Sequence, residues 1–402
     1  MGLLQEGVVC GAVTKTDMTR KLTLDGVTKA YSVYKIRLDQ LYYNEQNDRI
    51  ATWLNEYASE HGPLPDGDRE TYNAVLEDFI VKSNPEAIRK TQKNIELVDQ
   101  REAGVVLNDG RIIDGNRRFT CLRKLAKNSE RFNSFEAVIL ERDMRDSAKQ
   151  IKMLELQIQH GEESRVEYSP VDRLVGVYQD IEENHLLTVE EYARSANEPL
   201  AEVKKRLEIA KLMVEFLGFI NAPKQYYIVR DLDLAAVLEE LFGVLRKCRT
   251  EDEKENIKSC AFANLIMRPA GDQTRFIRNM KSIVASDYAD SFVDEQLELA
   301  AKVVDTLPPR GKVNGKVIRD VIRANDELKD ELERSMEKAV TKTKRSETRN
   351  RPIQLVEKAT SLLEDIDVNI FLKMSDSELQ RLSRQIRLLE QTLADIKENL
   401  ND

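Results

Sequence analysis

The fold is indicated most clearly by residues 109–125, which read DGRIIDGNRRFTCLRKL. The apolar residues 105–107 just before them predict a buried strand, and Asp109-Gly110 is typical of a tight hairpin turn. Ile112-Ile113 predicts a short return strand that ends at Gly115, since glycine readily adopts the backbone conformation of a sharp turn. The stretch therefore predicts a strand, a glycine turn and a helix, in that order.

The helix is predicted to begin near Asn116, because apolar residues recur every third position from Phe119 to Leu125. Arg117 and Arg118 then lie in its first turn, where unpaired backbone N–H groups and the positive end of the helix dipole attract anions. Natural helices favour carboxylates at this position. Two arginines there indicate an anion-binding site; the alternative is that both are solvated surface charges.

Residues 114–118, DGNRR, resemble the phosphate-binding box of the ParB/sulfiredoxin-like superfamily, in which such a box follows a strand and opens a helix. Residues 34–49 look like the family's opening strand and a loop that ends in an arginine, here Arg49. Residues 137–140 look like its closing strand. The similarity covers residues 30–215 and implies a small N-terminal α/β domain that binds a nucleotide.

The resemblance also implies a ligand, a nucleoside triphosphate (CTP or ATP) bound with magnesium. Guanidinium groups suit bidentate contact with its phosphates. The residues expected at the nucleotide are Gly115, Asn116, Arg117, Arg118, Arg49 and Gln157.

Two other boxes of the family depart from its pattern. The first usually contains a proline, which residues 98–104 lack, so recognition of a cytosine base is not carried over. The third is Glu-Asn-x-x-Arg, and its counterpart here, residues 156–160, reads LQIQH. Gln157 then takes the amide position and His160 the arginine position. Glu155 is the nearest carboxylate, but one residue of helix turns it by about 100°.

Catalysis is an alternative function, because some relatives of this fold are nucleases or phosphotransferases. Either chemistry needs a carboxylate near the phosphates. The candidates are Asp114, Glu155 and Asp48, and Glu155 is also the candidate magnesium ligand. Asp114 would serve equally well as a turn cap, and Glu155 as a solvated helix charge. Sulfiredoxin chemistry is not expected, because Asn116 stands where that enzyme has its cysteine. A non-catalytic interaction scaffold is the third alternative.

Composition limits the class of protein. The 402 residues are too many for one ordinary domain, so two or more are expected. Charged residues at 33%, with only 16 glycines and 10 prolines, favour a helix-rich chain. The four cysteines lack the spacing of a metal site. No stretch predicts a membrane span or a secretory signal, so we expect a cytoplasmic protein without a membrane partner.

The predicted fold class is α+β: a small N-terminal ParB/sulfiredoxin-like α/β domain, then a mostly helical remainder that ends in a coiled coil or a helical hairpin. Strands are predicted at residues 8–13, 21–24, 30–38, 102–107, 112–113 and 135–140, with a turn between the first two. The predicted parts are the nucleotide-binding domain 1–145, a helix-turn-helix-like domain 146–220, a helical domain 221–305, a helix and basic linker 306–351, and a helical hairpin or coiled coil 352–402.

Residues 187–207 have the form of a helix-turn-helix. Thr188 can cap the first helix, Asn197 tolerates a left-handed turn, and Pro199 suits the start of the second helix. In the ParB family such a unit follows the nucleotide domain and binds DNA. Glutamates dilute its positive face here, so a purely structural helical module is the alternative. The residues expected to contact DNA are Arg194, Lys204, Lys205 and Arg206.

The net charge of −9 argues against a protein that coats nucleic acid indiscriminately. Residues 341–351 are basic, lack apolar periodicity and are followed by Pro352. This pattern favours a linker; a strip that contacts phosphates is the alternative.

The C-terminal residues carry a heptad pattern. Leucine or isoleucine recurs in steps of three and four from Leu379 to Leu400, and residues 375–378 supply a capping box. Residues 353–366 predict another amphipathic helix, so the two could close into a hairpin within one chain. The regular heptads favour instead a homodimer through residues 375–400.

Together these patterns predict a ParB-like, nucleotide-binding, DNA-associated protein that acts as a dimer. Plasmid, phage, defence or chromosome-related biology would suit such a protein.

Overall fold

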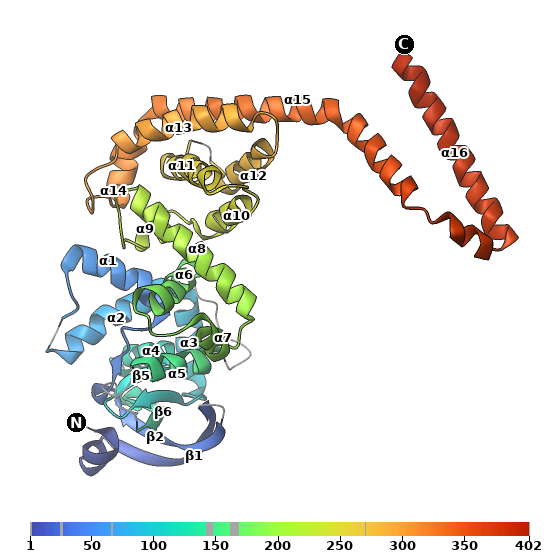
Figure 1. Ribbon diagram of the computed structural model, residues 1–402. Coiled ribbons are helices and arrows are strands. Elements are labelled where there is room, and N and C mark those ends of the chain that lie inside the picture. Colours follow the sequence, from blue (N-terminus) through green and yellow to red (C-terminus); the bar gives the residue numbers. More distant parts are fainter. Residues whose placement is uncertain are drawn as a thin grey trace. The chain divides into compact units, whose positions relative to one another are not determined.

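The protein is described from a computed structural model (Figure 1), which describes residues 2–24, 27–65, 67–141, 148–160, 169–269 and 271–401. The chain forms two compact units, unit 1 (Met1–Ala339) and unit 2 (Val340–Asp402). The boundaries predicted near residues 145, 220 and 305 all lie inside unit 1.

The sheet of unit 1 is mixed and has the strand order β1-β2-β6-β4-β5-β3. Neighbouring strands are antiparallel, except that β4 runs parallel to β6 and β3 parallel to β5. The bounds are β1 Val13–Leu24, β2 Val27–Arg37, β3 Tyr42–Tyr43, β4 Gly104–Leu107, β5 Arg111–Asp114 and β6 Ser134–Leu140. The α+β class expected from the sequence is confirmed.

Helices make up the rest of the described chain. The bounds are α1 Ala51–His61, α2 Arg69–Ser83, α3 Pro85–Val98, α4 Asn116–Ala126, α5 Ala148–His160, α6 Pro170–Tyr178, α7 Val189–Ala196, α8 Leu200–Phe219, α9 Tyr227–Asp231, α10 Ala235–Leu245, α11 Glu251–Met267, α12 Gln273–Val284, α13 Ala289–Asp305, α14 Gly315–Val317, α15 Asp326–Glu364 and α16 Asp376–Asn401. Short helical turns are η1 Leu3–Gly7, η2 Leu38–Gln40, η3 Asp48–Ile50, η4 Glu130–Phe132, η5 Gln179–Glu183, η6 Ile318–Ile322 and η7 Val368–Lys373.

Helices cover both faces of the sheet. Consecutive strand residues point to opposite sides, so each strand contributes side chains to two separate cores. Val106 and Ile112 belong to a core that includes residues of α2, α3 and α4. Val105 and Ile113 belong to the core on the other face, with residues of α5. The sheet is therefore the middle of three layers, and Figure 1 shows α4 and α5 beside its strands.

The predicted helix-turn-helix is present as α7 and α8. The Thr188 hydroxyl accepts from the Glu191 backbone N–H, and the Glu191 side chain accepts from the Thr188 N–H, which completes a capping box. Asn197 ends α7 in the left-handed conformation, with φ of 53°. These local signals behave as the sequence predicts.

Two predicted strands need correction. Residues 8–13 were expected to be a strand, but β1 begins only at Val13. The residues before it form a helical turn, anchored where the Leu3 N–H donates to the Asn108 carbonyl at 2.7 Å. The turn expected before residue 21 is instead a bulge within one long strand, because the pairing of β1 with β2 shifts between Lys15 and Thr19.

The basic segment 341–351, predicted to be a linker, lies inside the 39-residue helix α15. Lysine, arginine and glutamate are good helix formers even without an apolar face. Pro352 stays within the helix, where it lacks one backbone donor but does not end the helix.

Unit 2 leaves its apolar residues uncovered. The seam residues Leu379, Ile386, Leu393, Ile396 and Leu400 of α16 are 37–77% exposed. Ile353, Val356 and Leu363 on the C-terminal part of α15 are exposed as well. The two helices therefore do not bury these residues against each other.

None of the helices among the described residues combines the length and the apolar character that crossing a membrane requires.

Candidate functional site

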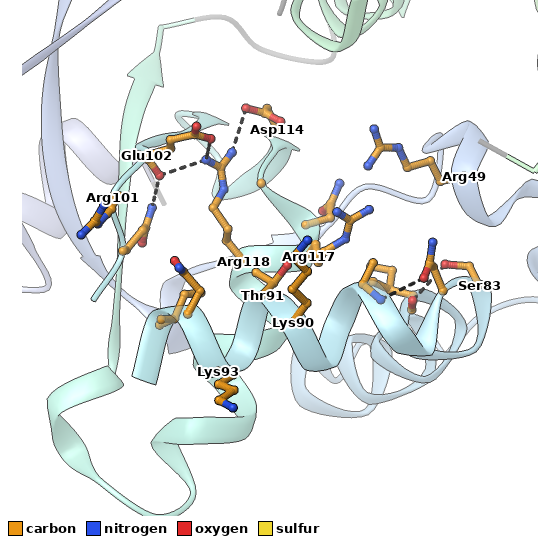
Figure 2. A pocket seen from close by; sticks show the side chains of 18 of the residues that line it. Arg49, Ser83, Lys90, Thr91, Lys93, Arg101, Glu102, Asp114, Arg117 and Arg118 are labelled. Atoms are coloured by element: carbon orange, nitrogen blue, oxygen red, sulfur yellow. Dashed lines mark hydrogen bonds and ion pairs between the residues drawn. The ribbon is translucent and has the colours of Figure 1, made fainter. Parts of the chain in front are cut away.

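A cavity of about 890 Å³ lies where the box predicted from the sequence meets α3 (Figure 2). The turn from β5 to α4 forms one wall, α3 forms another, and the loop before α1 contributes Arg49. The predicted nucleotide contacts that line it are Gly115, Asn116, Arg117, Arg118 and Arg49.

Gly115 provides the sharp turn that starts α4. Its φ is 101°, a conformation that side-chain-bearing residues rarely adopt, and its carbonyl accepts from the Phe119 N–H at 2.9 Å. A Cβ on Gly115 would lie 2.7 Å from Cζ of Phe135. Both the backbone and its surroundings therefore require glycine here.

Arg118 is fixed by carboxylates. Its guanidinium forms ion pairs with Glu102 at 2.8 Å and with Asp114 at 3.1 Å, and the same Asp114 oxygen lies 3.0 Å from the Arg20 guanidinium of β1. Figure 2 shows Arg118 held between these two acids at the cavity wall. Asp114, a candidate catalytic residue from the sequence, is thus shared by two arginines in this structure.

Arg117 has different surroundings, although it is the neighbour of Arg118 in the sequence. Figure 2 shows Arg117 and Arg49 pointing into the same part of the cavity. Partial burial, and then the positive charge of Arg49, lower the pKa of Arg117 to about 10. No carboxylate of the described residues forms an ion pair with Arg117. The cavity therefore concentrates positive charge at the first turn of α4.

The wall from α3 was missed in the sequence analysis, which predicted no helix there. It brings Lys90, Thr91 and Lys93 to the cavity. The signal was Asn84-Pro85: the Asn84 side chain accepts from the Ala87 N–H at 2.9 Å, and proline suits the first position of a helix.

Glu155 lies elsewhere, in a buried ionic cluster formed by Asp48, Lys152, Glu155 and Asp180. The Lys152 ammonium, on a residue that is 2% exposed, lies 2.5 Å from Asp48, 3.4 Å from Asp180 and 3.7 Å from Glu155. Neither Glu155 nor Gln157 lines the cavity. The side chain of His160 lies outside the described residues.

The buried ionic cluster has more acid than base. Burial alone would lower the pKa of Lys152, but the carboxylates of Asp48, Glu155 and Asp180 outweigh it and raise the pKa well above its usual value. Burial raises the pKa of Asp180 to about 7, despite the neighbouring ammonium. Burial of Asp180 therefore favours its protonated form more than water would.

A magnesium ion does not fit Glu155 as placed here, because the Lys152 ammonium already occupies the cationic position beside it. Within the described ranges, no three histidine, cysteine or acidic side chains gather in a way that could hold a metal ion. No chemical step is therefore assigned to a metal at Glu155.

The residues expected to contact DNA divide into two pairs. Arg194 and Lys204 are exposed on α7 and α8. Lys205 instead lies 2.5 Å from the Glu239 carboxylate, and Arg206 lies 2.7 Å from that of Glu198.

Comparisons with known proteins give little more. No protein-family model matches the chain, and no curated protein matches it. One solved structure with some similarity is described as the C2221 form of a Pnob8-like ParB-N domain. It is 12% identical to this chain, and the alignment covers 79% of this chain and 100% of that one, with a TM-score of 0.29. A similarity at that level does not establish a shared fold or function.

Proposed function

We propose that the cavity beside α4 binds the phosphate groups of a nucleoside triphosphate. The observation that carries the proposal is Arg117, a partly buried guanidinium at a helix N-terminus that points into the cavity together with Arg49. The positive charge of Arg49 disfavours that of Arg117, and an anion bound beside Arg117 would offset this effect. Backbone N–H groups at the start of α4 add donors for the same anion.

The cavity's other residues support a charged and extended ligand. Lys90 and Lys93 add positive charge along α3, while Arg118 is held by acids and shapes the wall. CTP and ATP are the proposed ligands. Magnesium enters with the triphosphate in this proposal, since the carboxylates of Asp114 and Glu155 are held by cationic side chains.

Replacing Arg117 with alanine is expected to weaken triphosphate binding about 10- to 150-fold, the equivalent of roughly 1.5–3 kcal/mol for a lost charge-assisted hydrogen bond. Calorimetric titration of the full chain with CTP and with ATP, each with and without magnesium, measures the change. Lys127→Ala is the matched control, because Lys127 follows α4 at its other end and does not line the cavity.

Equal affinities for the wild type, Arg117→Ala and Lys127→Ala proteins would contradict the proposal, as would a wild type that binds neither nucleotide. Arg118→Ala is expected to differ from Arg117→Ala. It should lower the stability of the fold in addition to any effect on binding, because it leaves Asp114 and Glu102 without this partner.

We further propose that the protein associates with DNA through the helix-turn-helix and acts as a homodimer through residues 375–400. Arg194 and Lys204 are available for DNA because both are exposed. The dimer proposal is supported by the uncovered seam of α16, since burying such residues stabilises by roughly 1.5–3 kcal/mol for each large apolar side chain.

The double variant Ile386→Lys, Leu393→Lys is expected to be monomeric, because two charges at the centre of the seam would have to be buried in a dimer. Multi-angle light scattering of the full chain gives the mass directly. Gln380→Lys with Gln391→Lys adds the same charge to other positions of α16 and is expected to remain dimeric. A wild type that is already monomeric at micromolar concentration would refute the dimer.

A further inference from the structure

A basic segment lies outside both the cavity and the helix-turn-helix. Residues 310–323 contain five lysines or arginines and one aspartate, a local charge of +4 in a chain whose net charge is −9. They lead into α14 and η6, which follow each other without a break. This segment is as basic as residues 111–124 beside the cavity, which also carry a local charge of +4.

Three of these cations lie along the helical stretch formed by α14 and η6, with Arg323 as its C-cap residue. Lys316, Arg319 and Arg323 are spaced by three and four residues, a spacing that makes side chains neighbours on a helix. Lys316 and Arg319 are exposed, and a Cβ on Gly315 would lie 3.5 Å from the Arg319 guanidinium, which therefore lies back over the start of this stretch.

A fourth cation, Arg268, lies at the end of α11, close to Arg323. Nε of Arg323 donates to the Ile266 carbonyl at 2.8 Å, and its Nη2 donates to the Leu265 carbonyl at 3.4 Å, so Arg323 is held against the last turn of α11. Arg268 follows directly as the C-cap residue of that helix. Burial, and then the positive charges of Arg268 and Arg319, lower the pKa of Arg323 to about 10.

We call Arg268, Lys316, Arg319 and Arg323 the basic patch. Within the part of the chain that the structure describes, no carboxylate forms an ion pair with any of the four. Asp320 stands beside the patch without pairing to it, which leaves a local charge of +3.

Cations of the neighbouring helices behave differently, because they are paired with carboxylates of the same chain. Lys254 lies 2.6 Å from Glu251, Arg278 lies 2.9 Å from Glu240, and Lys302 lies 2.7 Å from Glu331. Among the described residues, the lack of an ion-paired carboxylate therefore distinguishes the basic patch from these neighbouring cations.

We infer that the basic patch binds the sugar-phosphate backbone of duplex DNA. Like charges that are held close together repel one another, and a dense row of anions beside them offsets that repulsion. Duplex DNA carries one negative charge for about every 1.7 Å of its length, and arginine contacts phosphate in a bidentate manner. The inference does not depend on nucleotide binding. It adds a contact that is independent of base sequence to unit 1, where Lys205 and Arg206 are already paired with acids.

The test compares full-length proteins in titrations with a duplex of arbitrary sequence across a series of salt concentrations. The patch variant is Arg268→Gln, Lys316→Gln, Arg319→Gln; Arg323 is kept because it holds the end of α11. We expect about tenfold weaker binding at low salt. The slope of log affinity against log salt should become shallower by roughly 2–3, since each lost phosphate contact removes about 0.9.

The matched control is Lys254→Gln, Arg278→Gln, Lys302→Gln, which removes the same three charges elsewhere and should bind DNA as the wild type does. Equal losses in both variants would assign the effect to net charge and overturn the inference, and so would a patch variant with unchanged slope. If the triple variant does not fold, the single variants Lys316→Gln and Arg319→Gln carry the same comparison.

Other outcomes also decide the matter. A patch-dependent preference for single-stranded RNA over duplex DNA would overturn DNA as the partner. A wild type that binds no duplex at low salt would overturn this inference and the proposed DNA association together. Neither result touches the nucleotide proposal, which the titrations of Arg117→Ala test separately.

Discussion

Replacing Lys152 with methionine is expected to lower the free energy of unfolding of unit 1 by about 3–5 kcal/mol, the usual cost of breaking a buried ion pair by removing one partner. The reason is that Asp48, Glu155 and Asp180 would keep their buried positions without the ammonium that lies 2.5–3.7 Å from them. Urea unfolding followed by fluorescence of Trp53, the chain's one tryptophan, measures the change.

The control is Lys149→Met, one turn earlier on α5. Lys149 pairs with Glu191 at the surface, so its loss should leave the unfolding midpoint close to that of the wild type. Adding Asp180→Asn to Lys152→Met should recover part of the lost stability, because it removes one of the stranded carboxylates. If Lys152→Met unfolds at the same urea concentration as Lys149→Met, the buried ionic cluster does not hold α5 as described.

Replacing Gly115 with alanine is expected to cost about 2–4 kcal/mol of stability and to abolish measurable binding at the cavity. The left-handed backbone alone costs roughly 1–2 kcal/mol for a residue with a Cβ, and a forced shift in a packed core adds about 1–3 kcal/mol. The Phe135 ring, 2.7 Å from the new Cβ, has to move. Thermal unfolding by circular dichroism and nucleotide titration of the same protein report the two effects.

Gly243→Ala is the comparison for this experiment. Gly243 lies within α10, and a Cβ there meets nothing within 4 Å, so alanine should stabilise that helix by about 0.5–1 kcal/mol. A Gly115→Ala protein as stable as Gly243→Ala would show that the β5–α4 turn tolerates a side chain.

Elements with short-range signals could be predicted from the sequence. The β5–α4 turn depends on a glycine at the end of a strand, and the helix-turn-helix on Thr188, Glu191 and Asn197, all within a few residues of each other. Such features need no knowledge of distant contacts. Helix α3 was missed although its buried residues Ile88 and Ile95 stand seven positions apart, a helical spacing that could have indicated it.

The candidate site depends on contacts between residues that are far apart in the sequence. Arg117 and Arg118 are identical neighbours, and the sequence assigns both to phosphate binding. What distinguishes them is Asp114 and Glu102 around Arg118, together with Arg20, which comes from a strand 94 residues before Asp114. Contacts at such separation depend on how strands pair, which no motif of five residues contains. Glu155 illustrates the same limit, since the Lys152 ammonium beside it also contacts Asp48, which stands on a different element.

Asp48 and Arg49 are joined by a single peptide bond, yet one side chain enters the buried ionic cluster and the other enters the cavity. Both residues belong to the short turn η3, so an anion that displaced Arg49 would also disturb the contact between Asp48 and Lys152. Energetic coupling of this kind is reciprocal, so if the proposed triphosphate contacts Arg49, its binding and the protonation of Asp180 should each affect the other. On the proposed function, η3 would therefore couple the cavity to the buried ionic cluster.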